Sequence, residues 1–185
     1  MGDSYQSFVL PEVGTGYAAA VAARLSDWLV ARGIAQEGGT TAPQGVTSFS
    51  PGPQAEEALM VERPNWRDIA FRDIHIDPHR RVSSAVQGGL GPVLCPACRT
   101  PMGDDEAIPS SFTEAADEWL RGGEGMLDCP ACHSSTSIAN WRTEPFWAFG
   151  DVTITFWNWP PIEESFVRQV EAAAGQSVKV VRGKI

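Results

Sequence analysis

Two identical Cys-Pro-Ala-Cys segments constrain this chain more than any other feature. They run from Cys95 to Cys98 and from Cys129 to Cys132, and together they hold all four cysteines of the 185 residues. A Cys-x-x-Cys turn brings two sulfurs onto one ion, and a second turn completes a tetrahedral shell of the kind that zinc prefers. The proline after each first cysteine stiffens its turn. The spacing therefore predicts one structural zinc ion bound by four thiolates.

The two segments resemble the paired knuckles of zinc-ribbon and treble-clef modules, and the resemblance covers residues 93–141. It implies a small four-cysteine fold built around one metal ion. Two features depart from the usual pattern of such knuckles. Arg99 and His133 stand where glycine is common, and the long span between the knuckles has room for a short helix. A capping box formed by Ser111 and Glu114 predicts the start of that helix.

Three other interpretations of the cysteines stay open, namely two disulfides, a redox dithiol and an iron centre of the rubredoxin type. The N-terminus has no basic start followed by an apolar stretch, so we expect a cytoplasmic protein with reduced thiols. A redox motif needs only one pair, near a strand–helix junction. Four thiolates also leave no open coordination position, which favours a structural metal over a catalytic one.

The charge of the chain indicates which classes of partner it is expected to bind. The whole chain carries a net charge of −9, and the segment from Val93 to Arg142 has eight acidic residues against three arginines. Proteins that bind the phosphates of nucleic acids are usually basic. Nucleic acid is therefore not the expected partner, and a protein contact is favoured. No apolar run approaches the roughly 20 residues of a membrane helix, so no membrane contact is expected. The oligomeric state is not predicted.

The most basic stretch runs from Arg63 to Arg81 and contains five arginines. It could bind phosphate, which keeps a nucleic-acid-binding zinc ribbon as an alternative function. Three aspartates interleave with the arginines, so a solvated, salt-bridged surface is the favoured interpretation.

Strand and helix patterns flank the cysteine segment on both sides. Apolar residues at helical spacing predict a helix over 17–32, between strand candidates at 7–10 and 46–49. Alternation predicts a strand over 152–157, and a helical apolar stripe then leads to a closing strand at 178–181. Two strand–helix–strand halves can pack as one antiparallel sheet. We therefore expect an α+β fold, a ferredoxin-like sandwich with both helices on one face and an inserted four-cysteine zinc ribbon.

These elements predict one composite domain made of three segments. Residues 1–90 hold the first strand–helix–strand half and an irregular segment, residues 91–142 the zinc-ribbon insertion, and residues 143–185 the second half. A glycine-rich stretch at 87–92 indicates a hinge into the insertion.

A second metal site is a weaker hypothesis. His75, Asp77 and His79 alternate in the sequence, so on a strand their side chains would share one face. Two histidines and a carboxylate can hold a catalytic metal, which would make the chain a metal-dependent enzyme. Pro78 disturbs the geometry that such a site needs, and a polar strand end followed by a turn is the simpler interpretation.

Aromatic residues crowd the segment between Trp141 and Trp159. Trp157 and Trp159 are expected on the face opposite the apolar side of strand 152–157, where they are candidate hot spots for a protein partner. Packing in the core is the alternative for both residues. The leading hypothesis is a non-enzymatic, zinc-stabilised protein-interaction module, an adaptor or subunit of a cytoplasmic assembly.

Overall fold

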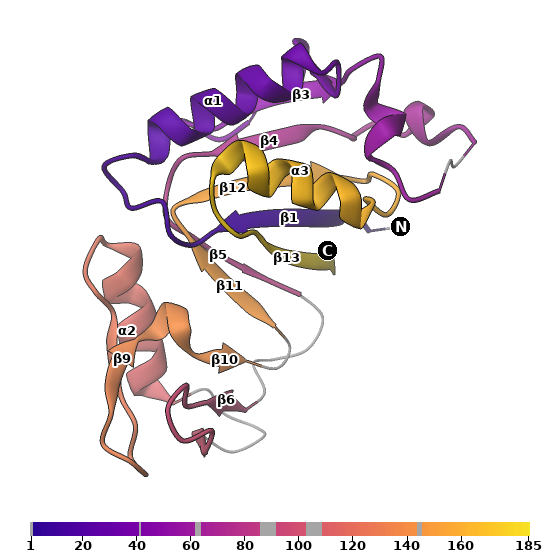
Figure 1. Cartoon of the computed structure of the whole chain (residues 1–185). Helices are drawn as coiled ribbons and strands as arrows, with labels where there is room; N and C mark the ends of the chain where they lie inside the picture. The colour runs from indigo at the N-terminus through magenta and orange to yellow at the C-terminus, as the bar shows by residue number, and fades with distance from the viewer. Residues whose placement is uncertain (1, 41, 62–63, 86–91, 103–108, 144–145) are drawn as a thin grey trace.

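The computed structural model describes residues 2–40, 42–61, 64–85, 92–102, 109–143 and 146–185 (Figure 1). These residues form three α-helices and several antiparallel sheets, so the predicted α+β class is confirmed. In this part of the chain, no helix combines the length and the apolar character needed to cross a membrane.

The largest sheet has six strands, and every neighbouring pair in it is antiparallel. In order across the sheet, the strands are β13 (Lys179–Lys184), β1 (Ser4–Leu10), β12 (Val152–Trp157), β4 (Ile74–Asp77), β3 (Thr47–Pro51) and β2 (Ala35–Gln36). The predicted strands at 7–10, 46–49, 152–157 and 178–181 all fall on observed strands. Strand β4 lies between β3 and β12, so the strand at 47–51 does not pair with the strand at 152–157.

Two helices cover one face of this sheet, α1 (Ala18–Ala31) and α3 (Glu164–Ala174). They contact each other, with the rings of Trp28 and Phe166 5.9 Å apart. Because strand side chains alternate between faces, Ile154 and Phe156 share this core with α1 and α3, as the alternation predicted. Gly175 ends α3 in the left-handed conformation that glycine adopts without strain.

The opposite face of the sheet is partly covered by a two-stranded ladder of β5 (Arg81–Ser84) and β11 (Trp147–Gly150). Ala148 of this ladder packs against Val9 and Val181 of the sheet. The ladder leads from the large sheet to the cysteine module, which lies below and to the left of that sheet in Figure 1.

The cysteine module, residues 93–142, has its own small core. Three large aromatic residues of the module, Phe112, Trp119 and Trp141, are buried in it, and Phe149 of β11 joins them. The division of the chain into segments at 91 and 142 stays a prediction. The strands and the helix of this region are β6 (Val93–Leu94), β7 (Pro101–Met102), α2 (Ser110–Leu120), β8 (Met126–Asp128), β9 (Ser135–Ser137) and β10 (Arg142–Thr143). The described 3-10 helices are η1 (Ala55–Ala58), η2 (Trp66–Asp68) and η3 (Ile138–Asn140).

Candidate metal centre

The four cysteines converge although 30 residues separate the two pairs in the sequence. All four Sγ atoms lie within 4.8 Å of one another. The Sγ atoms of Cys95 and Cys132 are 3.8 Å apart, and those of Cys98 and Cys129 are 3.7 Å apart. A tetrahedron with metal–sulfur bonds of about 2.3 Å has edges of about 3.8 Å, whereas a disulfide needs sulfurs about 2.05 Å apart. The arrangement therefore fits one four-coordinate metal ion and does not fit disulfides.

Both knuckles have the same backbone hydrogen bonds. In each, the residue after the second cysteine donates its N–H to the carbonyl of the first cysteine at 2.9 Å. The first cysteine donates its own N–H to the carbonyl of the residue five positions later, which is Thr100 in one knuckle and Ser134 in the other, at 3.1 and 2.9 Å. Strands β6 and β7 flank the first knuckle, and β8 and β9 flank the second. Two matching hairpin turns thus aim their sulfurs at a common centre.

Hydroxyl groups lie beside the sulfurs at matching positions. The Oγ1 of Thr100 is 3.2 Å from the Sγ of Cys98, and the Oγ of Ser134 is 3.2 Å from the Sγ of Cys132. The N–H of Ala97 also points at the Sγ of Cys95, at 3.4 Å. The N–H of Ala97 and the hydroxyl of Ser134 can donate to the neighbouring sulfurs and so favour the thiolate form, which is the form that binds metal. The thiol of Cys98 instead donates to the Oγ1 of Thr100. The sequence carries a signal for the two hydroxyl groups, because a hydroxyl residue follows each second cysteine by two positions.

The thiols resist ionising together in the absence of a cation. Burial opposes ionisation of Cys95, but the N–H of Cys98 and the hydroxyl of Ser134 outweigh it and lower the pKa of that thiol to about 6. For Cys129, the N–H of Cys132 acts in the same direction, but burial and the neighbouring thiols prevail and raise its pKa to about 11. A bound cation compensates the negative charge that keeps the last thiol protonated.

Arg99 and His133 adopt positive φ angles of 61° and 57°. They occupy the positions where glycine is common in such knuckles, and the backbone geometry gives the reason. The turn needs the left-handed conformation there, which any residue with a Cβ adopts at a cost.

Replacing His133 with glycine is therefore expected to stabilise the folded chain. Relief of the left-handed conformation gains about 1–2 kcal/mol, while the added freedom of glycine in the unfolded chain costs about 0.5–1 kcal/mol. A net gain of up to about 1 kcal/mol should raise the urea midpoint of the metal-bound protein. Ser135→Gly, at an exposed position of β9, is the matched control and should lower it. Equal losses in both variants would contradict the prediction.

Arg80 attaches the cysteine module to the large sheet. Its Nε forms an ion pair with Oδ1 of Asp151 at 3.0 Å, and both side chains are largely buried. Its Nη1 donates to the carbonyls of Trp119 and Gly123, at 2.8 and 2.7 Å, where α2 ends. The guanidinium carbon lies 4.6 Å from the centre of the Trp119 ring. Because a helix end leaves carbonyls without intrahelical partners, Arg80 completes this end of α2.

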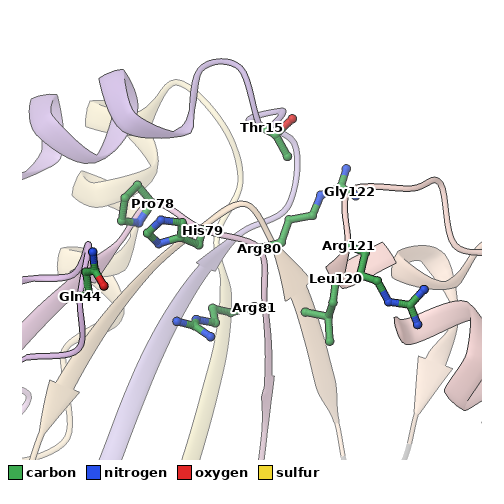
Figure 2. Close-up of a pocket in the computed structure, with 9 residues that line it drawn as sticks. All are labelled: Thr15, Gln44, Pro78, His79, Arg80, Arg81, Leu120, Arg121 and Gly122. Carbon is green, nitrogen blue, oxygen red and sulfur yellow. The ribbon is translucent and has the colours of Figure 1, made fainter. Parts of the chain in front are cut away.

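A depression of about 540 Å³ lies beside Arg80, between the loop before α1, the turn before β5 and the end of α2. Figure 2 shows Arg80 reaching toward the end of α2, with Arg81 and Arg121 elsewhere in the lining. The charge of each of these arginines is matched by an aspartate, at 3.0, 2.6 and 3.8 Å respectively. This depression therefore offers no uncompensated positive charge for a phosphate. Arg63 of the basic stretch lies outside the described residues.

The structure places His75, Asp77 and His79 on or beside β4 but does not gather them around one point. The Nδ1 of His75 accepts a hydrogen bond from the indole N–H of Trp157 at 3.3 Å. The two carboxylate oxygens of Asp77 lie 2.7 Å from Nδ1 of His79 and 2.6 Å from Nε of Arg81. Burial lowers the pKa of His75. Within the described ranges, the four cysteines alone come together as three or more possible metal ligands.

Trp157 and Trp159 both pack within the chain. Trp159 is 5% exposed and lies in the helix-covered core with Phe156, not on the opposite face as expected. The reason is Asn158, whose left-handed φ of 54° interrupts the strand alternation. Trp157 is half-buried and contacts the rings of Tyr5 and Phe71. A role for either tryptophan in binding a partner stays a prediction.

No protein-family model matches the chain, and neither a curated protein nor a solved structure matches it. Its function is therefore inferred from the site itself.

Proposed function

We propose that this chain is a non-enzymatic, zinc-stabilised protein-interaction module that serves as an adaptor or subunit of a cytoplasmic assembly. The observation that carries the proposal is the convergence of four sulfurs at tetrahedral spacing. Four thiolates fill the coordination shell of zinc and leave no position for a substrate or an activated water. The metal is then a structural support, and the function lies on the surface that it supports.

Zinc is the proposed metal because structural sites with four thiolates and paired Cys-x-x-Cys turns are typical of it. Iron of the rubredoxin type needs the same ligands and is the main competitor. Thiolates ready to bind metal also indicate a reducing compartment such as the cytoplasm. The excess of acidic residues in the cysteine module favours a protein over a nucleic acid as partner.

We also infer that the large sheet and its helices form a ferredoxin-like core. The antiparallel order β13-β1-β12-β4 supports this, together with α1 after β1 and α3 between β12 and β13. Strands β2 and β3 would be an addition at one edge of that core. This fold hosts many unrelated functions, so it adds no argument for a particular one.

One experiment with two readouts on the intact chain, purified under reducing conditions, tests the proposed function. Elemental analysis should give one zinc per chain and no iron. Affinity capture at native expression should retain a protein partner, and nuclease treatment should leave that partner bound. Loss of the partner with nuclease would favour the nucleic-acid alternative. A second metal equivalent, lost in His75→Ala, would favour the enzyme alternative, and a folded chain without metal would end the proposal.

A further inference from the structure

The six-stranded sheet ends in an open strand edge at β13. Within the described residues, β13 pairs with β1 and with no other strand. Residues of an antiparallel pair alternately exchange hydrogen bonds with the partner strand and point away from it. The N–H of Ile185 donates to the carbonyl of Asp3 at 2.8 Å, so Ile185 and every second residue before it turn their backbone groups toward β1. Val180, Arg182 and Lys184 therefore point their backbone N–H and C=O groups away from the sheet.

A groove of about 480 Å³ runs beside this edge, between α3 and β13. Val178 and Val180, both half-buried, give it apolar surface, and Met60, which is 55% exposed, also lines it. Because strand side chains alternate, Arg182 shares the groove face with Val180, whereas Val181 packs on the opposite face of the sheet. The groove thus joins an apolar surface to a row of free backbone groups.

This edge is basic in a chain whose net charge is −9. Arg182 and Lys184 are exposed and lie two positions apart. Neither makes an ion pair with any residue that the structure describes. The Nε of Arg182 is 3.3 Å from the amide oxygen of Gln6. The acidic side chains of α3 that line the groove already have partners, which are Arg168 for Glu164 at 3.6 Å and the N–H of Val178 for Glu171 at 3.0 Å.

We infer that β13 and this groove bind an extended acidic segment of a protein partner, which adds to the sheet as an antiparallel strand. The inference rests on the proposed interaction function and names its site. Free backbone groups supply hydrogen bonds to the added strand, and alternate side chains supply specificity. Acidic side chains lie opposite Arg182 and Lys184, and an apolar side chain lies opposite Val180. Antiparallel pairing with a second β13 would set like charges opposite one another when the register is centred on Arg182 or on Gly183, and an acidic segment meets no such repulsion from these two residues in any register.

Titration of the isotope-labelled, metal-bound full chain with the peptide acetyl-ETETVT-amide, followed by amide NMR shifts, tests this inference. The acidic residues of this peptide can lie opposite Arg182 and Lys184, and its valine opposite Val180. Saturable shifts at millimolar peptide are expected in residues 178–184 and in α3. The basic peptide acetyl-KTKTVT-amide should bind at least tenfold more weakly. Absence of shifts in β13, or equal binding of both peptides, would overturn the inference.

Two variants separate edge pairing from general charge attraction. Arg182→Pro removes one outward N–H and leaves the ladder with β1 intact, so it should abolish binding. Arg182→Glu keeps the N–H and should weaken binding at least tenfold, which provides a second test if the proline variant fails to fold. Arg121→Glu makes the same charge change on the cysteine module and should bind as the parent does.

Capture experiments with the same variants distinguish this inference from the proposed function. A partner retained by the parent and lost by Arg182→Glu supports both. A partner retained equally by the parent and Arg182→Glu overturns the open-edge site and leaves the interaction function standing. If the parent chain captures no partner but its β13 still binds the acidic peptide, the proposed function is contradicted. The inference that the open edge binds an acidic strand is then still supported.

Discussion

Removal of the metal is expected to unfold the cysteine module while the six-stranded sheet stays folded. A module of about 50 residues rarely holds itself together by its apolar core alone. Structural zinc contributes apparent binding free energies of about 10–16 kcal/mol in small zinc-finger peptides, and that binding energy is also folding energy. The sheet has a separate core around Phe8, Leu25 and Phe156, in which no cysteine takes part.

Cys129→Ser is the sharpest way to remove the metal, because Cys129 is one of the two buried cysteines among the four candidate ligands. Hydrogen exchange followed by mass spectrometry should show lost protection in α2, β8 and β9 and retained protection in β1 and β12. Ser135→Ala, which changes an exposed hydroxyl on the same hairpin, is the matched control and should keep both metal and protection. Protection of α2 that persists in the metal-free protein would contradict the prediction.

The cysteine site could be predicted from the sequence because most of its information is local. Each knuckle contains its ligands and its turn within a few residues, and identical spacing in two places leaves few other functions for four thiols. The glycine-like positions of Arg99 and His133 are local as well, and both prove to be left-handed. The helices were predictable for the same reason, since an apolar stripe of 3.6-residue period and a following glycine mark each of them.

The features that escaped prediction depend on distant contacts. Strand β4 enters the sheet between β3 and β12, a choice that its four residues do not encode by themselves. Trp159 reaches the core because one residue, Asn158, turns the chain out of its alternation. Arg80 and Asp151 are 71 positions apart, and nothing in either segment marks them as partners. Pairings of this kind are decided when the whole chain packs, after local preference has chosen the elements.

Arg80→Ala is expected to destabilise the protein by about 3–5 kcal/mol, because removing one partner of a buried ion pair leaves the other charge buried and unpaired. The side chain of Asp151 is 6% exposed, and among the described residues its carboxylate also accepts a hydrogen bond from the N–H of Gly14 at 2.9 Å. The substitution also leaves the carbonyls of Trp119 and Gly123 without the donor that they share. The loss of stability should therefore be large, and it should weaken the packing of the cysteine module against the large sheet.

Urea unfolding of Arg80→Ala, followed by tryptophan fluorescence and by far-ultraviolet circular dichroism, measures this effect. Arg121→Ala is the matched control, because Arg121 and Asp117 are both exposed and their contact at 3.8 Å is a surface ion pair worth about 0–1 kcal/mol. Asp151→Ala combined with Arg80→Ala should cost less than the sum of the two single changes, since each removes the same interaction. Equal small losses for Arg80→Ala and Arg121→Ala would show that the module is held to the sheet by its apolar contacts, such as Phe149 against Trp119, and not by Arg80.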